Sequence, residues 1–204
     1  MENDVLTRLV DQLLNDPRYA GHPLREALKG LQEQNRVLKI ASTHDPLTGI
    51  GNRALLTRCL QEESQRVQRT GRSYCLAILD VDNFKRINDT WGHAAGDLVL
   101  KAIAQALMSS IREGDICGRW GGEEFLVIMP DVGLAEARHV VEHFNQTVAE
   151  LAIPAEAAII RITSSVGATQ YTPNEHYAQA LQRADGALLQ AKQAGRARCI
   201  YQYP

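Results

Sequence analysis

A short apolar run that ends in two acids does most to limit the folds open to this chain. Residues 75–79, CLAIL, are apolar throughout, and Asp80 and Asp82 follow them directly. An apolar run of this length is typical of a strand buried in a sheet. Burial at the strand end would penalise the two carboxylates unless a positive charge lies nearby. We therefore expect a buried strand over residues 74–80 whose acids meet a cation.

Helices and strands alternate along the chain from His44 onward. A hairpin within this order favours a mixed α/β sandwich over a purely parallel sheet. The periodicity predicts helices over about 52–70, 84–91, 94–112, 134–150 and 175–194, a hairpin over 116–129, and strands over 159–170 and 197–202.

Length and composition exclude several classes of protein. The 204 residues allow one domain of about 150 to 170 residues plus a short appendage. The net charge of −2 gives none of the basic excess that marks nucleic-acid binders. The longest apolar runs, such as 125–129, are far shorter than the roughly 20 residues of a membrane span, and the acidic start does not read as a secretory signal. These features predict a cytoplasmic protein.

Residues 1–43 form the predicted appendage, which has helical spacing and a break at Asp16-Pro17. Its second half has apolar residues seven apart, which is the pattern of a short coiled coil. A helix packed on its own domain is the alternative, because three heptads are few. In a coiled coil, Asn35 would fix the register and a two-stranded state. The seam consists of Leu24, Leu31 and Leu38, alternating with Leu28, Asn35 and Ser42.

A second acidic pair, Glu123-Glu124, follows Gly121-Gly122 and precedes another apolar strand. Two glycines permit a tight turn that presents both carboxylates at a strand edge. If this strand neighbours residues 74–80, the two acidic pairs converge. Converging oxygen ligands with room for phosphate oxygens suit Mg²⁺, although either pair alone would also suit a solvated loop.

Several motifs now identify a resemblance to one known family. The segment 121–125, GGEEF, resembles the signature of GGDEF-domain diguanylate cyclases in its Glu variant. The resemblance extends over residues 44–203 and includes DPLTG at 45–49, Asn52-Arg53, DVDNFKRIND at 80–89, GHAAGD at 92–97 and AKQAGR at 191–196. It implies an α/β (α+β) fold, a nucleotidyl-cyclase-like palm domain with a mixed, mostly antiparallel central sheet flanked by helices, as the catalytic domain from residue 44 to 204.

The resemblance also implies which residues hold the metal. Asp80, Glu123 and the backbone carbonyl of Val81 correspond to ligands of two Mg²⁺ or Mn²⁺ ions. Glu124 corresponds to a further acid near the metals or the attacking hydroxyl, so both glutamates are catalytic candidates. We expect structural roles for Asp82 and Phe84.

Substrate contacts follow from the same resemblance. Asn88 and Asp97 correspond to the residues that read guanine, and a carboxylate accepts from guanine N1–H and its amino group as adenine cannot reproduce. His93 lies between them, where a structural hydrogen bond is an equal alternative. Lys85 follows the acidic strand and could contact the triphosphate, as could the i, i+4 pair of Lys192 and Arg196. The resemblance favours phosphate binding for Lys192 and Arg196, although cations also stabilise a helix C-terminus.

Arg112 and Asp115 resemble the family's RxxD product-inhibition site, at its usual offset from the signature. Arginine can fork onto guanine O6 and N7 or onto a phosphate. A surface ion pair is the alternative interpretation. The further basic residue that such sites recruit cannot be placed from this sequence.

Together these motifs predict a diguanylate cyclase that condenses two GTP molecules into cyclic di-GMP and two pyrophosphates. Because each domain of this family binds one GTP, catalysis requires a homodimer. A catalytically silent domain that only binds GTP or cyclic di-GMP is the alternative, and the intact signature argues against it. With no sensor domain in residues 1–43, a protein partner at the stalk is the predicted activator.

Overall fold

The computed structural model describes residues 10, 12–19, 22–155 and 158–204. The chain divides into two compact units, Met1–Ser42 and Thr43–Pro204. Among the described residues, no helix has both the length and the apolar character needed to cross a bilayer.

The N-terminal unit is helical. A 3-10 turn, η1, covers Pro17–Tyr19, and the long helix α2 covers Pro23–Thr43. Pro23 suits the first position of a helix, where its missing N–H leaves no hydrogen bond unmade. Leu31 and Leu38 of the predicted seam are 56% and 66% exposed, so α2 presents an apolar stripe that another helix could cover.

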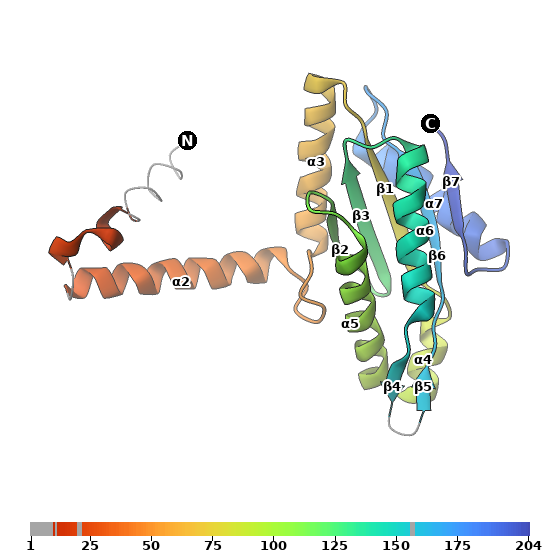
Figure 1. The fold of residues 1–204 in the computed structure, drawn as a ribbon, viewed down its shortest axis with the longest axis horizontal. Coiled ribbons are helices and arrows are strands. Elements are labelled where there is room, and N and C mark those ends of the chain that lie inside the picture. The colour runs from red at the N-terminus through yellow and green to blue at the C-terminus, as the bar shows by residue number, and fades with distance from the viewer. Residues whose placement is uncertain (1–9, 11, 20–21, 156–157) are drawn as a thin grey trace. The chain divides into compact units, whose positions relative to one another are not determined.

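A five-stranded sheet forms the centre of the second unit, in the order β2-β3-β1-β6-β7 (Figure 1). All its pairs are antiparallel except that of β6 with β7. Every residue of the middle strand β1 is buried. The mixed sheet and the buried strand agree with the sequence prediction. The bounds are Tyr74–Val81 for β1, Ile116–Gly121 for β2, Glu124–Pro130 for β3, Ser164–Gln170 for β6 and Cys199–Gln202 for β7.

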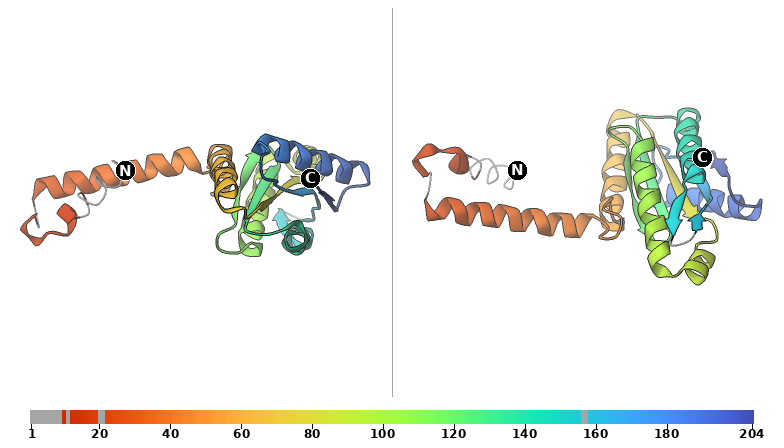
Figure 2. Two further views of the ribbon diagram at one scale, coloured as in Figure 1. Left: turned by 90° about the horizontal axis from the view of Figure 1, so that it is seen from above. Right: turned by 60° about the horizontal axis from the view of Figure 1, so that its bottom comes forward.

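Helices cover both faces of this sheet (Figure 2). Alternate residues of β1 point to opposite faces, so Leu76 and Ile78 pack in one cluster and Ala77 and Leu79 in the other. The first cluster lies under α3, Arg53–Thr70, and α7, Tyr177–Gln193. The second lies under α4, Phe84–Trp91, α5, His93–Ser110, and α6, Leu134–Glu150.

Gly167 lets α7 lie against the sheet. A Cβ on this residue of β6 would come within 2.1 Å of the Ala184 carbonyl oxygen and 2.2 Å of the Leu188 nitrogen, both in α7. Only glycine allows this approach, which fixes the helix that carries Lys192.

The single strand predicted over 159–170 was wrong. Its first part is β5, Ala158–Ile160, which pairs with β4, Ile153–Ala155, in a separate two-stranded sheet. The chain joins the main sheet only at β6, after the Thr163 carbonyl has accepted a hydrogen bond from the Asp82 N–H at 2.9 Å. The residue pattern of one segment cannot show that its pairing partner changes halfway along it.

Candidate functional site

The end of β1 brings two acids and a cation together. Asp80 lies directly opposite Glu124 in the register of β1 and β3, so both side chains point to the α7 face of the sheet. From α7, the ammonium of Lys192 comes within 2.8 Å of Asp80 Oδ2. Lys192 thus occupies the place of the cation that the sequence predicts beside Asp80.

The burial of Asp80 and Glu124 is only partly compensated by nearby positive charge. It raises the pKa of Asp80, and the hydrogen bond from Lys192 offsets this only in part. Burial also raises the pKa of Glu124, and the nearby carboxylates of Asp80 and Asp185 add to the effect. Asp185 escaped the sequence analysis because a lone acid within a helix gives no signal. A buried and a half-buried carboxylate that share one ammonium favour the approach of a further cation.

Glu123 faces a different space from Glu124. It lines a hollow of about 390 Å³ beside the α4–α5 junction. The same hollow is lined by four predicted substrate residues, Lys85, Asn88, His93 and Asp97. The structure therefore gathers the predicted guanine readers next to one signature acid, and the other signature acid next to Asp80.

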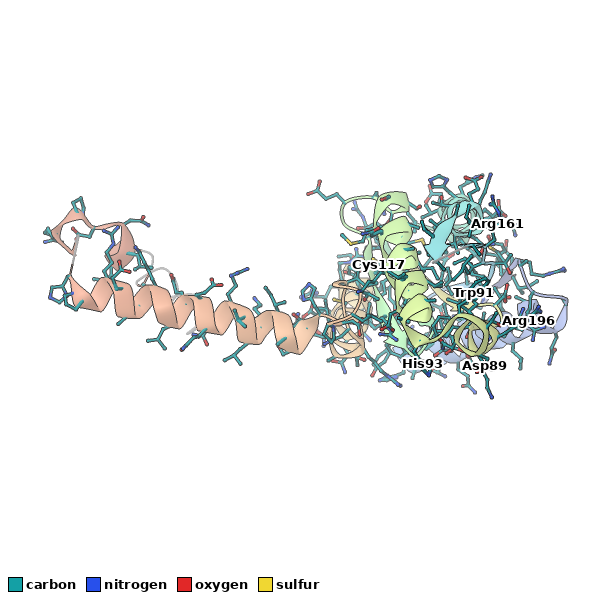
Figure 3. The ribbon with its side chains drawn as sticks, turned by 90° about the horizontal axis from the view of Figure 1, so that it is seen from below. Asp89, Trp91, His93, Cys117, Arg161 and Arg196 are labelled. Atoms are coloured by element: carbon teal, nitrogen blue, oxygen red, sulfur yellow. The ribbon has the colours of Figure 1, made fainter. Side chains whose placement is uncertain are left out.

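A close contact between α4 and α5 positions Asn88. A Cβ on Gly96 would lie 2.0 Å from Asn88 Oδ1, so this glycine makes room for the amide. Gly92, with φ 82°, turns the chain between the two helices and donates its N–H to the Asn88 carbonyl at 2.9 Å. Figure 3 shows Asp89 and His93 together at this corner of the domain.

Arg119 holds the signature turn in place. Its Nε donates to the Gly122 carbonyl at 2.8 Å, and its Nη1 lies 3.3 Å from Asp45 Oδ1. The turn is also joined to β1, because the Val81 N–H donates to the Glu123 carbonyl at 3.3 Å. Sequence analysis missed Arg119, although a basic residue two positions before the glycine pair is a usable signal.

The donor set at this edge fits a divalent ion that arrives with a nucleotide. Asp80, Glu123, Glu124 and the Val81 carbonyl offer the hard oxygens that Mg²⁺ prefers. Within the described parts of the chain, no three acidic, His or Cys side chains gather closely enough to hold an ion alone. Mg²⁺ commonly takes one or two protein carboxylates and completes its shell with water and phosphate oxygens.

The predicted phosphate-binding cations fall into two places. Lys192 lies in the last turn of α7, and Arg196 lies in the exposed turn that follows, close enough for its charge to lower the pKa of Asp80 against the effect of burial. Figure 3 labels Arg196 at this side of the domain. Lys85 instead borders the hollow with Glu123.

Arg112 and Asp115 lie between α5 and β2. Arg112 Nε is 3.0 Å from Asp115 Oδ1, and Arg112 Nη2 also donates to the Pro130 carbonyl. Asp115 is 1% exposed, whereas Arg112 is 54% exposed. Both line a hollow of about 390 Å³ that shares no residue with the one at Glu123. A larger hollow of about 610 Å³ between α4 and β5 contains none of the predicted site residues.

Comparison with known proteins adds independent information. Residues 42–198 match the family described as "Diguanylate cyclase, GGDEF domain". Diguanylate cyclase DgcP of Pseudomonas aeruginosa is 44% identical over 76% of this chain and 23% of its own length. Diguanylate cyclase DgcM of Escherichia coli is 37% identical over 84% of this chain and 40% of its own length. The chain thus spans less than half of these curated relatives.

Two crystal structures resemble nearly the whole chain. The diguanylate cyclase SiaD from Pseudomonas aeruginosa, solved with its activator SiaC, is 38% identical with a TM-score of 0.79, over 98% of this chain and 99% of that one. The coiled coil and GGDEF domain of DgcB from Caulobacter crescentus, solved with c-di-GMP, is 27% identical with a TM-score of 0.83, over 97% and 99%. The fold, the arrangement of the acids and these matches all agree. The chain belongs to the GGDEF-domain family of diguanylate cyclases.

Proposed function

We propose that this protein condenses two GTP molecules into cyclic di-GMP and releases two pyrophosphates. The observation that carries the proposal is the pairing of Asp80 with Glu124 at the sheet edge, against the ammonium of Lys192. These three charged groups lie where β1 meets the signature turn. Gly122 and Glu123 of the same turn line the hollow that Asn88 and Asp97 also line. A phosphate-binding end and a base-binding end are thus adjacent.

In the proposed reaction, the 3′-hydroxyl of one GTP attacks the α-phosphorus of the other, and pyrophosphate leaves. The same step then closes the ring. Asp80, Glu123, Glu124 and the Val81 carbonyl would hold two Mg²⁺ or Mn²⁺ ions. Bound divalent ions lower the pKa of a hydroxyl and offset charge on a phosphoryl group. Burial raises the pKa of both Asp80 and Glu124, and we assign to Glu124 the place near the attacking hydroxyl.

Recognition of guanine is assigned to Asn88 and Asp97. Both line the hollow beside α4, as does His93. The Asp97 carboxylate can accept from guanine N1–H and the exocyclic amine, and adenine offers no equivalent pair of donors. This contact would favour GTP over ATP.

The triphosphate is assigned to Lys192 and Arg196, with Lys85 approaching from α4. Lys192 lies 2.8 Å from Asp80, where it would be placed to exchange this carboxylate for a phosphate oxygen of the substrate. Electrostatic stabilisation of this kind accounts for most catalysis of phosphoryl transfer.

A homodimer is proposed because each domain of this family is expected to bind one GTP, in the hollow lined by Asn88 and Asp97. Two domains must then face one another across the two nucleotides. The exposed Leu31 and Leu38 of α2 supply a seam for pairing, and the similar DgcB structure includes a coiled coil. Residues 1–43 are thus proposed as a stalk that brings two catalytic domains, residues 44–204, together.

An activating protein is proposed to bind the same stalk. Val37 and Ile40 are 53% and 43% exposed and lie outside the predicted seam, so pairing through the leucines would leave both apolar side chains uncovered. The similar cyclase SiaD was solved with an activator, SiaC. A protein that covers Val37 and Ile40 would favour the dimer by mass action.

Product inhibition is assigned to Arg112 and Asp115. The hollow beside them is separate from the acids, and Arg112 is the exposed member of the pair. Its guanidinium is bound to Asp115 and to the Pro130 carbonyl, so a ligand must compete with these contacts.

The test is to incubate the purified chain with GTP and Mg²⁺ and to separate the nucleotides by chromatography. The expected products are cyclic di-GMP and pyrophosphate in a one-to-two ratio. Tight GTP binding without any product would instead support the silent, nucleotide-binding alternative. Equal turnover of ATP would contradict the assignment of the guanine site.

A further inference from the structure

Asp82 is a buried carboxylate that the proposed reaction does not use. It follows β1 and is 5% exposed. Its Oδ1 accepts from the Ser165 hydroxyl at 2.7 Å, and its Oδ2 accepts from the Thr163 hydroxyl at 2.7 Å. The third donor is the backbone N–H of Ala197, 3.0 Å from Oδ2 and 115 residues away in the sequence. Asp82 therefore ties β1 and β6 to the turn after α7.

That turn has an unfavourable backbone. After α7, Gly195, Arg196 and Ala197 have φ values of 110°, 64° and 48°. Glycine adopts positive φ freely, but Arg196 and Ala197 are strained there and need contacts that hold them. The Arg196 N–H donates to the Ala191 carbonyl at 3.0 Å, and the Ala197 N–H donates to Asp82.

The turn carries the residues assigned to the triphosphate. Arg196 lies within it, and Lys192 lies in the last turn of α7 just before it. On the far side, the Arg198 carbonyl accepts from the Val166 N–H at 2.9 Å, where β7 begins. Among the described residues, two side chains hydrogen-bond to the backbone of 195–197: the adjacent Arg198, whose Nε donates to the Arg196 carbonyl at 2.9 Å, and Asp82, which is distant in the sequence.

We propose that Asp82 is a positioning residue for the substrate triphosphate: its carboxylate holds the strained 195–197 turn and thereby sets Arg196 beside Asp80. This inference rests on the proposed function, because it assigns Arg196 to the triphosphate of that site. It assigns to Asp82 neither a metal ion nor the nucleotide.

The three groups that donate hydrogen bonds to Asp82 are all neutral. A role that depends on these hydrogen bonds can therefore be distinguished from one that depends on the negative charge of Asp82. In an Asp82→Asn variant, the amide oxygen can accept from the Ala197 N–H and the Thr163 hydroxyl. The amide nitrogen then faces the Ser165 hydroxyl, whose oxygen can accept. Asparagine therefore preserves the connection to the turn, whereas alanine removes it entirely.

The experiment compares Asp82→Ala, Asp82→Asn and Thr163→Ala in the full chain. Steady-state kinetics give KM and kcat for GTP. Equilibrium binding uses a GTP analogue with a methylene bridge between the α- and β-phosphates, which cannot turn over. Circular dichroism checks that each variant is folded.

For Asp82→Ala, we expect KM for GTP and Kd for the analogue to rise at least about tenfold, with kcat reduced less. This split follows because a displaced Arg196 weakens binding through the triphosphate. For Asp82→Asn, both constants should stay within about threefold of wild type. Thr163→Ala removes one of the three donors and should shift both constants in the same direction by less.

If Asp82→Ala does not fold, Thr163→Ala keeps the inference testable, and a second-site variant tests the role of the strained turn directly. Ala197→Gly removes the strain at φ 48°, so the turn depends less on Asp82. Adding Ala197→Gly to Asp82→Ala should recover part of the lost affinity. A residue that acted by binding metal could not be rescued in this way.

Unchanged KM and Kd in folded Asp82→Ala would overturn the inference, as would Asp82→Asn that is as damaging as Asp82→Ala. Failure of the proposed function looks different. In that case wild type makes no cyclic di-GMP, while binding of the analogue still reports whether Asp82 sets the phosphate-binding turn.

Discussion

Arg183 binds Glu175 through two parallel hydrogen bonds, from Nη1 and Nη2 to the two carboxylate oxygens, each at 2.8 Å. Arg183 also donates to the Gln170 carbonyl at 2.7 Å, at the end of β6. The hydrogen bond to Gln170 joins the N-terminal half of α7 to the sheet, and Glu175 holds the guanidinium in place. Arg183 therefore supports the helix whose far end carries Lys192.

The first prediction is a pH dependence of stability. Burial alone would raise the pKa of Glu175, but hydrogen bonds from Arg183 and Thr172 outweigh it and lower the pKa. A carboxylate with a depressed folded-state pKa stabilises the fold above its unfolded pKa of about 4.5, and this contribution is lost as the pH falls through the folded value. Glu175→Gln should lower the melting temperature at pH 7 by about 3–6 °C.

Melting curves of wild type and Glu175→Gln from pH 7 to about pH 3 check this prediction. The difference should shrink toward the acid end, because the protonated wild type then resembles the variant. Glu62→Gln is the control, since Glu62 is 65% exposed and its nearest basic atom is 3.7 Å away. A difference that stayed constant with pH would show that the charge of Glu175 is not what matters.

The second prediction concerns Glu123. Glu123→Gln should keep the fold but lower turnover at least about 100-fold, because it removes a ligand charge where phosphate charge must be offset. Product formation at saturating GTP and Mg²⁺ measures the effect, with Glu62→Gln as the matched exposed control. Turnover close to wild type would remove Glu123 from the catalytic site. Glu124→Gln should also reduce activity.

The third prediction concerns nucleotide choice. Asp97→Ser should weaken the preference for GTP over ATP, because guanine N1–H and the amino group would lose their acceptor. The ratio of kcat/KM for the two nucleotides should fall by about 10-fold or more, since an unpaired donor in a pocket costs roughly 1–3 kcal/mol. An unchanged ratio would exclude Asp97 from recognition of guanine.

The fourth prediction concerns feedback. Arg112→Ala should raise steady-state output of cyclic di-GMP without changing the initial rate, because the hollow at Arg112 is separate from the acids. Initial rates are measured with and without added cyclic di-GMP. Equal inhibition of wild type and variant would show that Arg112 and Asp115 form only an ion pair.

The fifth prediction links the stalk to the reaction. Deleting residues 1–40 should leave a folded, GTP-binding domain whose specific activity collapses at low protein concentration and partly recovers at high concentration. Three heptads give marginal pairing, so dimerisation should limit the rate. Activity per subunit that stayed high and independent of concentration would show that the stalk does not bring the active sites together.

Local patterns were sufficient to predict most of the elements. The apolar run at 75–79 predicted β1, and the helix expected over 52–70 is α3, which is capped by Asn52 and ended by Gly71 with φ 71°. The strand expected over 159–170 failed because apolar residues there serve two different sheets. Hydrophobic periodicity and residue propensity describe one segment at a time. The pairing partner of a strand depends instead on contacts between different segments.

The same distinction applies to the site. By itself, the sequence determined which residues to expect at the site, because acids after a buried strand, a glycine pair and the motifs around them are local signals. Only the tertiary structure decided which residues meet: Glu124 rather than Glu123 lies across from Asp80, Lys192 is their counter-ion, and Asp82 holds a turn 115 residues away. The physical reason is that strand register and the approach of α7 are set by packing over the whole sheet, and contacts between such distant residues leave no periodic trace in the chain.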